Sequence, residues 1–207
     1  MLAAQLVPKY RFENCAVVAL NEGGVMVGAQ IAMQLHSVLT MLLSAEINLP
    51  REPQALGGIS QDGAFSYNQF YSQGEIDEMV GEYYSLIEQE KMSRMQEMQH
   101  LVGSGGLIRK DLLKGRNIIL VADGLPSGFM LDVAVQYLKP ISIEKVIVAT
   151  PLASVEAVDY MHVLADEIYC LSVIHDYIST DHYYDQQDIP DKETIVTTLE
   201  DIILHWR

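Results

Sequence analysis

The sequence predicts an α/β fold with a mostly parallel sheet flanked by helices. Short, continuously apolar segments rich in Val and Ile recur along the chain, and segments of helical periodicity separate them. Such strands are typical of a parallel sheet whose two faces are covered by helices. A loop rich in Gly, Pro and Ser also connects one of these strands to a helix. In parallel sheets, loops at this place are where ligands bind.

The first part of the chain predicts a strand, a helix and a second strand. The β-branched run at residues 16–20 ends in Asn21-Glu22-Gly23-Gly24, and residues 25–36 then have helical periodicity. Residues 37–44, SVLTMLLS, fit a second buried strand. A loop containing two prolines follows at residues 50–53.

The next segment predicts a hairpin followed by a long helix. Asp62-Gly63 lies between two apolar-alternating runs, residues 55–59 and 64–67, and this pattern is a hairpin signal. Residues 75–101 contain no Pro and one Gly, and their apolar side chains recur at helical spacing. We interpret the hairpin and the helix, about residues 55–103, as an insertion or flap, with the glycine-rich residues 103–106 as the helix stop.

The second half of the chain alternates between strands and helices. Strands are expected at residues 117–122, 145–150 and 168–171, with helices at 127–138, 154–164 and about 192–206. We find no internal repeat and no low-complexity linker. The sequence therefore predicts a single domain over residues 1–207.

Composition excludes several classes of function. The 207 residues carry a net charge of −15, which argues against nucleic acid and anionic membranes as partners because binding to phosphates depends on Lys and Arg. No apolar run approaches the ~20 residues of a membrane span, and the first residues lack a secretory pattern, so we expect a cytoplasmic protein. Cys15 and Cys170 have no metal-ligand spacing and are expected to be reduced core thiols.

The loop in the stretch VADGLPSGFM, residues 121–130, is the main candidate site. It follows an apolar strand and opens a helix, whose N-terminus offers free N–H groups and the positive end of a dipole. Gly124 and Gly128 give backbone freedom, and Ser127 gives a hydroxyl. This pattern is typical of a phosphate-binding loop, although many similar turns bind nothing.

Four segments in order resemble the type I phosphoribosyltransferase family, in particular its small bacterial members. The loop resembles the family's V-D-D-G-x-x-T-G-x-T. Residues 20–32, LNEGGVMVGAQIA, resemble its L-P-R-G-G-V-P-V-A segment. Residues 145–171 resemble its strand, V-P-x-A-P loop, helix and A-D-E-V-x-C-L strand, and residues 182–200 resemble its ending. The resemblance covers nearly the whole chain.

The resemblance implies transfer of phosphoribosyl from phosphoribosyl pyrophosphate to a nitrogen of a nucleobase-like acceptor, with pyrophosphate leaving as a magnesium complex. It implies that Asp123, the retained member of an acid pair, holds the ribose hydroxyls and is the catalytic residue. The 5′-phosphate loop would consist of Asp123, Gly124, Leu125, Pro126, Ser127, Gly128 and Phe129, and the equivalent of the pyrophosphate loop would be Glu22, Gly23 and Gly24.

The chain departs from the family pattern where the pattern carries charge and hydroxyl groups. The first acid of the pair is Ala122, and the second loop Thr is Met130. Pro126 supplies no N–H. The Arg before the double glycine is Glu22, and Ala45-Glu46 align with an Arg-Lys pair. Two expected cations have therefore become glutamate.

These departures lead to the hypothesis of a degenerate phosphoribosyltransferase with weak or no transferase activity and a binding or interaction role. Glu22 is expected to satisfy the N-terminus of the following helix itself. The alternative is an active transferase that uses phosphoribosyl pyrophosphate, Mg²⁺, Asp123 and Ser127; otherwise no cofactor is expected. A sugar phosphate is a further possible ligand, and by analogy the long helix is expected to form a homodimer.

Two further groups have ordinary explanations. His175, Asp176, Asp181, His182 and Asp185 match no tight metal-ligand spacing, so we expect no metal site; a role on the substrate side of the cleft is the better functional interpretation. The Tyr and Met side chains of the long helix, Tyr83, Tyr84, Met92, Met95 and Met98, are expected to pack in the core or in an interface.

Overall fold

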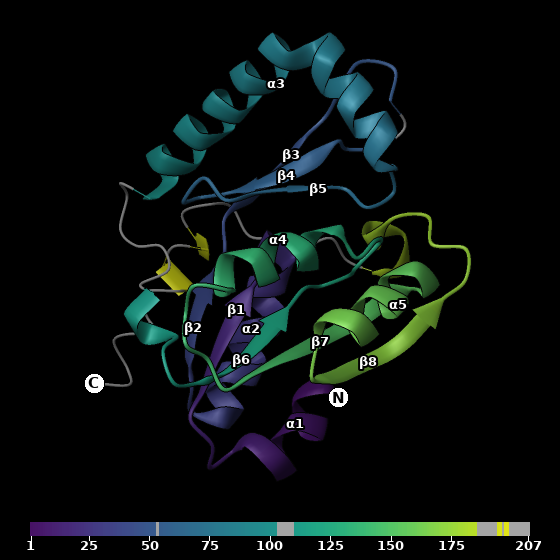
Figure 1. Ribbon diagram of the computed structural model, residues 1–207. Helices are drawn as coiled ribbons and strands as arrows, with labels where there is room; N and C mark the ends of the chain where they lie inside the picture. Colours follow the sequence, from purple (N-terminus) through teal and green to yellow (C-terminus); the bar gives the residue numbers. More distant parts are fainter. Residues whose placement is uncertain (53, 103–109, 186–193, 196, 199–207) are drawn as a thin grey trace.

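The computed structural model describes residues 1–52, 54–102, 110–185, 194–195 and 197–198, with the side chains of 99–102 excepted. The predicted helix stop at 103–106 and most of the closing helix at 192–206 lie outside these residues. Two units are visible in Figure 1: a helix-covered parallel sheet, and a smaller sheet beneath a long helix.

The larger unit is a five-stranded parallel sheet, as predicted. Its strand order is β2-β1-β6-β7-β8. The two central strands pair in parallel, with Val18 of β1 opposite Leu120 of β6. The strands are β1 (Cys15–Ala19), β2 (Val38–Met41), β6 (Asn117–Val121), β7 (Lys145–Ser154) and β8 (Glu167–Ile174).

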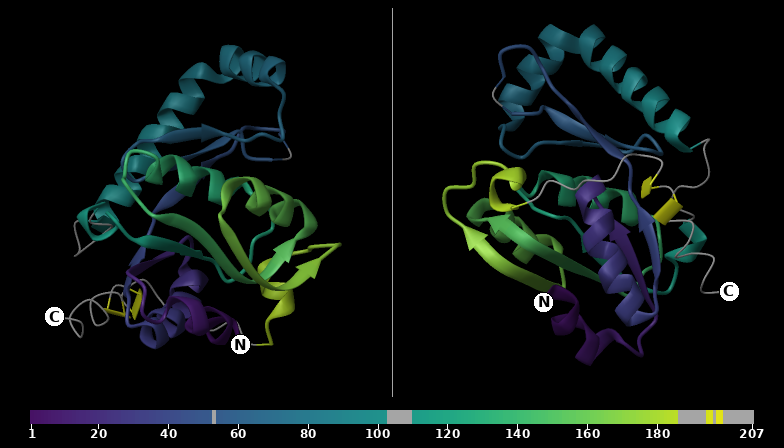
Figure 2. Two further views of the ribbon diagram at one scale, coloured as in Figure 1. Left: turned by 60° about the horizontal axis from the view of Figure 1, so that its bottom comes forward. Right: turned by 180° about the vertical axis from the view of Figure 1, so that it is seen from behind.

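Helices cover both faces of this sheet because its strands are apolar on both sides. Val17 and Ile119 pack on one side with α1 (Leu2–Tyr10) and α2 (Glu22–Leu35). Val18 and Leu120 pack on the other side with α4 (Phe129–Leu138) and α5 (Val155–Leu164). The two views in Figure 2 show these helical layers on opposite faces. No helix of the described chain is long and apolar enough to span a bilayer.

The helix α1 was not predicted from the sequence. Pro8 lies inside it, and a proline usually ends a helix because it removes an intrahelical hydrogen bond. Here Leu2, Leu6 and Tyr10, four residues apart, are all buried. The apolar surface that they bury offsets the lost hydrogen bond one turn before the end of the helix.

The predicted second strand at residues 37–44 is confirmed over Val38–Met41, but the last three residues of the prediction do not belong to it. β2 ends at Met41, and the chain then leaves the parallel sheet to form β3 (Ser44–Ile47) of a second sheet. The predicted hairpin is confirmed: β4 (Gly57–Ser60) and β5 (Phe65–Tyr67) pair antiparallel, and β3 joins the other edge of β4. An apolar run cannot reveal where a chain passes from one sheet to another.

The long helix α3 (Gln73–Val102) covers this smaller sheet and is kinked at Tyr83. The long helix predicted over residues 75–101 is confirmed, and of its apolar side chains Ile76, Met79 and Ile87 are buried with strand residues of the small sheet. The methionine side chains of α3 differ in their exposure to solvent: Met98 is buried in this core, whereas Met92 is exposed.

Three contacts fix the small sheet to the larger unit. The Gln69 amide donates a 2.8 Å hydrogen bond to the buried carboxylate of Asp132 in α4. Gly58 lies so close to the Phe129 ring that an added Cβ would be 2.7 Å from it. Lys110 donates to Asp62 of the hairpin turn at 2.7 Å. The small sheet is thereby held against α4, the helix that follows the candidate loop.

Candidate functional site

The site lies at the carboxyl ends of the adjacent strands β1 and β6, where the chain leaves the sheet in two directions. The chain leaves β1 for α2 on one face of the sheet, whereas it leaves β6 for α4 on the other. Adjacent strands whose connections go to opposite faces leave a crevice at their carboxyl ends. The loop at Asn21 and the loop at Asp123 are the two walls of this crevice.

A cleft of about 520 Å³ opens at this crevice. The residues that line it come from the two loops, from the chain between β2 and β3, from α3 and from the segment after β8. None of the described residues that line it is Lys or Arg. The lining residues are Leu20, Asn21, Glu22, Gly23, Met41, Leu42, Leu43, Ser44, Met98, Asp123, Met130, Thr180 and Asp181.

Asn21 joins the two walls through its side chain. Its Oδ1 accepts from the Gly24 N–H at 2.7 Å, which caps α2. Its Nδ2 donates to Asp123 Oδ1 at 2.7 Å. The expectation for Glu22 is met only in part. Glu22 is the acidic residue of the first turn, at the positive end of the helix dipole, but the side chain that caps the free N–H is that of Asn21, and Glu22 lines the cleft. Asn is a favoured N-cap residue, so a local signal for the cap was available; the bond to Asp123 has no local signal, because the two residues lie 102 positions apart.

The double glycine permits this close approach of the two loops. A Cβ on Gly23 would overlap the Asp123 carboxylate. A Cβ on Gly24 would lie 2.7 Å from the Val121 carbonyl oxygen. The Gly-Gly pair is thus a requirement of packing between the loops, independent of any bound pyrophosphate.

Asp123 keeps the position that the loop motif predicts, and it lines the cleft. Burial raises the pKa of this carboxyl, and the nearby charge of Asp181 raises it further, whereas the hydrogen bond from Asn21 opposes both effects. The backbone carbonyl of Asp123 accepts a 2.7 Å hydrogen bond from the Tyr184 hydroxyl.

The position of the lost acid is part of the core. Ala122 is 1% exposed and packs among the apolar residues between the sheet and α4. It does not line the cleft. A carboxylate there would be surrounded by apolar side chains in this conformation of the loop.

Two residues in the middle of the loop have no amide group to offer. Leu125 donates its N–H to the Leu152 carbonyl at 3.0 Å, so this amide is used within the protein. Pro126 has no N–H. Gly128 precedes α4 directly against the ring of Tyr160, which an added Cβ would overlap. Ser127, Gly128 and Phe129 lie outside the residues that line the cleft.

The segment after β8 closes one side of the cleft. Thr180 and Asp181 line it, from the 3₁₀ turn Thr180–Tyr183. The Tyr177 hydroxyl and Thr180 Oγ1 are 2.9 Å apart and lie against Gly124. Of the predicted acid and histidine group, only Asp181 lines the cleft, and within the described residues no three His, Cys, Asp or Glu residues are placed to hold a metal ion.

The second predicted charge reversal lies elsewhere. Glu46 is exposed in the middle of β3, opposite Gly58, and does not line the cleft. Ser44, at the start of the same strand, does line it. Asn21, Ser44, Thr180 and Tyr184 are thus polar residues of the site that sequence reasoning missed.

Comparison with known proteins connects this geometry to a family. Two proteins of Mycobacterium tuberculosis, each named "putative phosphoribosyl transferase", are 25% identical to this chain over 170 residues. That match covers 82% of this chain but 38% of each relative, so the chain spans well under half their length. The crystal structure of the protein TT1426 from Thermus thermophilus superposes with a TM-score of 0.71 at 23% identity, over 97% of this chain and 93% of that one.

A family model describes the same relationship over most of the chain. The model of the phosphoribosyl transferase domain matches residues 1–187, which include both loops, the small sheet and the segment after β8. The chain therefore belongs to the phosphoribosyl transferase family.

Proposed function

We propose that this chain is a phosphoribosyltransferase homologue with a degenerate active site, weak or no transferase activity and a binding or interaction role. One observation carries the proposal: the lining of the cleft between the two loops includes Glu22, Asp123 and Asp181 but no Lys or Arg among its described residues. Two like unit charges about 4 Å apart repel by roughly 4 kcal/mol at an effective dielectric of 20. Pyrophosphate carries several negative charges, and the acids of the cleft would repel each of them in this way.

The hydrogen bonds of the site support the same conclusion. Asn21 accepts a hydrogen bond from the Gly24 N–H and donates one to an oxygen of Asp123. This amide group and this carboxylate oxygen, which an incoming ligand would need, are therefore already bonded within the protein. In the phosphate loop, Leu125 and Pro126 provide no free N–H. The site keeps the acid Asp123 without the second acid and the cations of the family pattern.

The alternative is an active transferase acting on phosphoribosyl pyrophosphate and a nucleobase-like acceptor. Asp123 and Ser127 are retained, and the names of the mycobacterial relatives support this function. In this alternative Mg²⁺ would enter as a complex with the substrate, as the resemblance to the family implies.

The experiment that tests the proposal is a calorimetric titration with phosphoribosyl pyrophosphate and Mg²⁺, beside ribose 5-phosphate alone. We expect no binding of phosphoribosyl pyrophosphate. The informative variant combines Glu22→Arg with Asp181→Asn, because both residues lie outside the buried core and line the cleft. We expect this double variant to bind phosphoribosyl pyrophosphate and Glu22→Arg alone not to. Micromolar binding by the unmodified chain, weakened by Ser127→Ala, together with pyrophosphate release that depends on an added nucleobase acceptor, would establish the transferase instead.

Two accompanying proposals concern the context in which the protein acts. We expect a cytoplasmic homodimer in which α3 contributes to the interface, since Tyr84 and Met92 are exposed on that helix. Sedimentation equilibrium would give the mass of the assembly. A monomer at all concentrations would contradict this proposal without bearing on the cleft.

A further inference from the structure

The cleft combines two kinds of surface. One part is apolar and includes Met41, Met98 and Met130, which we call the methionine wall. The other part is acidic and comprises Glu22, Asp123 and Asp181. These six residues come from five separate segments of the chain, since only Asp123 and Met130 share one, so the combination is a property of the folded cleft rather than of one acidic stretch.

The acidic part does not suit a bound metal ion. A divalent cation needs several oxygen ligands that converge within about 2.0–2.6 Å of one point. Within the described residues, no three acidic, His or Cys side chains are placed to do this. Carboxylates spread over a cavity of about 520 Å³ instead match a positive charge carried by a larger molecule.

We propose that the cleft binds a small organic cation whose positive charge is attracted by the acidic lining, with Asp123 as its nearest partner, and whose apolar body packs on the methionine wall. This inference rests on the proposed function, because a cleft that held pyrophosphate could not also favour a cation. It names the class of ligand that the degenerate site accepts.

The surroundings of Asp123 show why a cation is favoured there. Its Oδ1 accepts from Asn21, a neutral amide, and no cation lines the cleft among the described residues. A partly buried carboxylate that is paired only with neutral groups is stabilised by an opposite charge. Methionine side chains are flexible and polarisable, so the methionine wall can adapt to ligands of different shape.

The test uses three probes that share an apolar body and differ in charge: 2-phenylethylammonium, 2-phenylethanol and phenylacetate. Binding is followed by chemical-shift titration at low salt, with the Asp123 side chain as a reporter. We expect the cation to bind about fivefold more tightly than the alcohol, the anion not to bind, and the pKa of Asp123 to fall when the cation is bound.

Variants separate the cleft from the net charge of the protein. Asp181→Asn and Glu22→Gln should each weaken the cation and leave the alcohol unchanged. Asp159→Asn removes an exposed acid of α5 that does not line the cleft and should change neither. Equal affinity for all three probes, or the same loss of cation binding in Asp159→Asn, would overturn the inference.

Titration of the same samples with phosphoribosyl pyrophosphate distinguishes the two proposals. If it binds with turnover, the proposed function fails and the inference fails with it. If neither it nor the cation binds, the inference alone fails, and the loss of the pyrophosphate site stands.

Discussion

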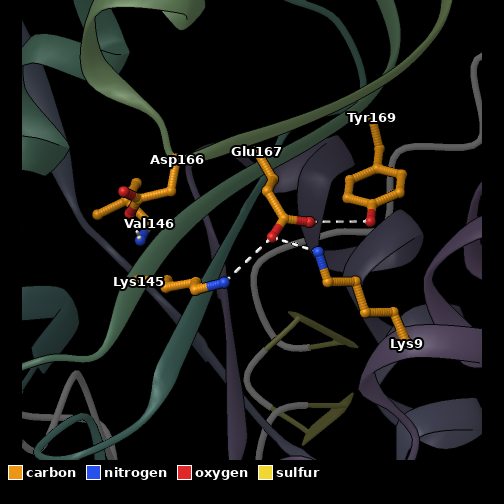
Figure 3. Close-up of polar contacts among 6 residues, drawn as sticks. All are labelled: Lys9, Lys145, Val146, Asp166, Glu167 and Tyr169. Atoms are coloured by element: carbon orange, nitrogen blue, oxygen red, sulfur yellow. Dashed lines mark hydrogen bonds and ion pairs between the residues drawn. The ribbon is translucent and has the colours of Figure 1, made fainter.

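Glu167 joins three elements at the amino edge of the parallel sheet. It is the first residue of β8, and its Oε1 accepts from Lys9 Nζ of α1 at 2.5 Å and from Lys145 Nζ of β7 at 3.3 Å. Its Oε2 accepts from the Tyr169 hydroxyl at 3.2 Å. Figure 3 shows these groups converging on one carboxylate. We expect Glu167→Gln to destabilise the protein because it removes the charge while keeping the shape.

The pKa of Glu167 sets the size of this effect. Burial alone would raise it, but the polar groups around the carboxylate, Lys9 first and then Tyr10, Lys145 and Tyr169, outweigh burial and lower it from 4.5 to about 2. At about 1.36 kcal/mol for each pKa unit, the upper bound is about 3.4 kcal/mol. The two lysine side chains are 52% and 47% exposed, so solvent screens the pairs and about 1–2 kcal/mol is expected.

The sign of the pH dependence follows from a pKa that folding lowers. The stabilisation is fully present above pH 4.5 and is lost as the pH falls toward 2. For a chain of this size, Glu167→Gln should lower the Tm at pH 7 by about 2–8 °C. The difference from the unmodified protein should shrink as the pH approaches 2.

Thermal unfolding followed by circular dichroism between pH 7 and pH 2 measures this difference. Glu144→Gln is the matched control, since Glu144 is exposed at the same edge of the sheet. An unchanged Tm for Glu167→Gln at pH 7, or a deficit as large at pH 2 as at pH 7, would refute the reasoning.

Three further predictions concern the loops and the small sheet. Asn21→Ala should lower the free energy of unfolding by about 1 kcal/mol through the lost helix cap. Side-chain NMR should also show a higher pKa for Asp123, since the hydrogen bond from Asn21 that opposes the effect of burial is gone. An unchanged pKa would contradict the role of this hydrogen bond. Gly58→Ala should destabilise by about 1–3 kcal/mol in denaturant titration because the added Cβ meets the phenyl ring of α4, whereas Gly74→Ala, with open space around it, should not. Tyr184→Phe should cost about 1 kcal/mol and increase amide hydrogen exchange after β8, because the bond to the Asp123 carbonyl is lost; identical exchange would show that this bond does not hold the segment.

The parallel sheet was predictable because its strands carry a local signal. A strand buried on both faces must be apolar throughout, and residues 117–121 come close to this condition, with every residue buried. The hairpin was predictable from Asp62-Gly63 for a similarly local reason, since Gly63 has a φ of +85°. By contrast, α1 and β3 depend on what they pack against: Pro8 is tolerated because Leu6 and Tyr10 are buried, and Ser44 starts a strand because β4 is beside it.

The candidate site was only partly predictable, because its contacts join distant segments. The loop motif located Asp123, since a strand, a Gly-rich turn and a helix are consecutive in the sequence. Asn21 reaches it across 102 residues, and Tyr184 across 61. Such pairings arise from the neighbouring carboxyl ends of β1 and β6, and no spacing within either segment reveals them.

The structure also changes the reason for expecting an anion-repelling site. From the sequence, the reversal of charge depended on Glu22 together with Glu46. Glu46 lies exposed on β3 outside the cleft, so its charge is largely screened by solvent. Asp181 instead joins Glu22 and Asp123 in the cleft lining. Asp181 follows β8 and Glu22 follows β1, so the two acids reach the cleft from separate segments. Substituting either one alone leaves two of the three acids in the cleft lining. We therefore expect restored binding of pyrophosphate to require both Glu22→Arg and Asp181→Asn.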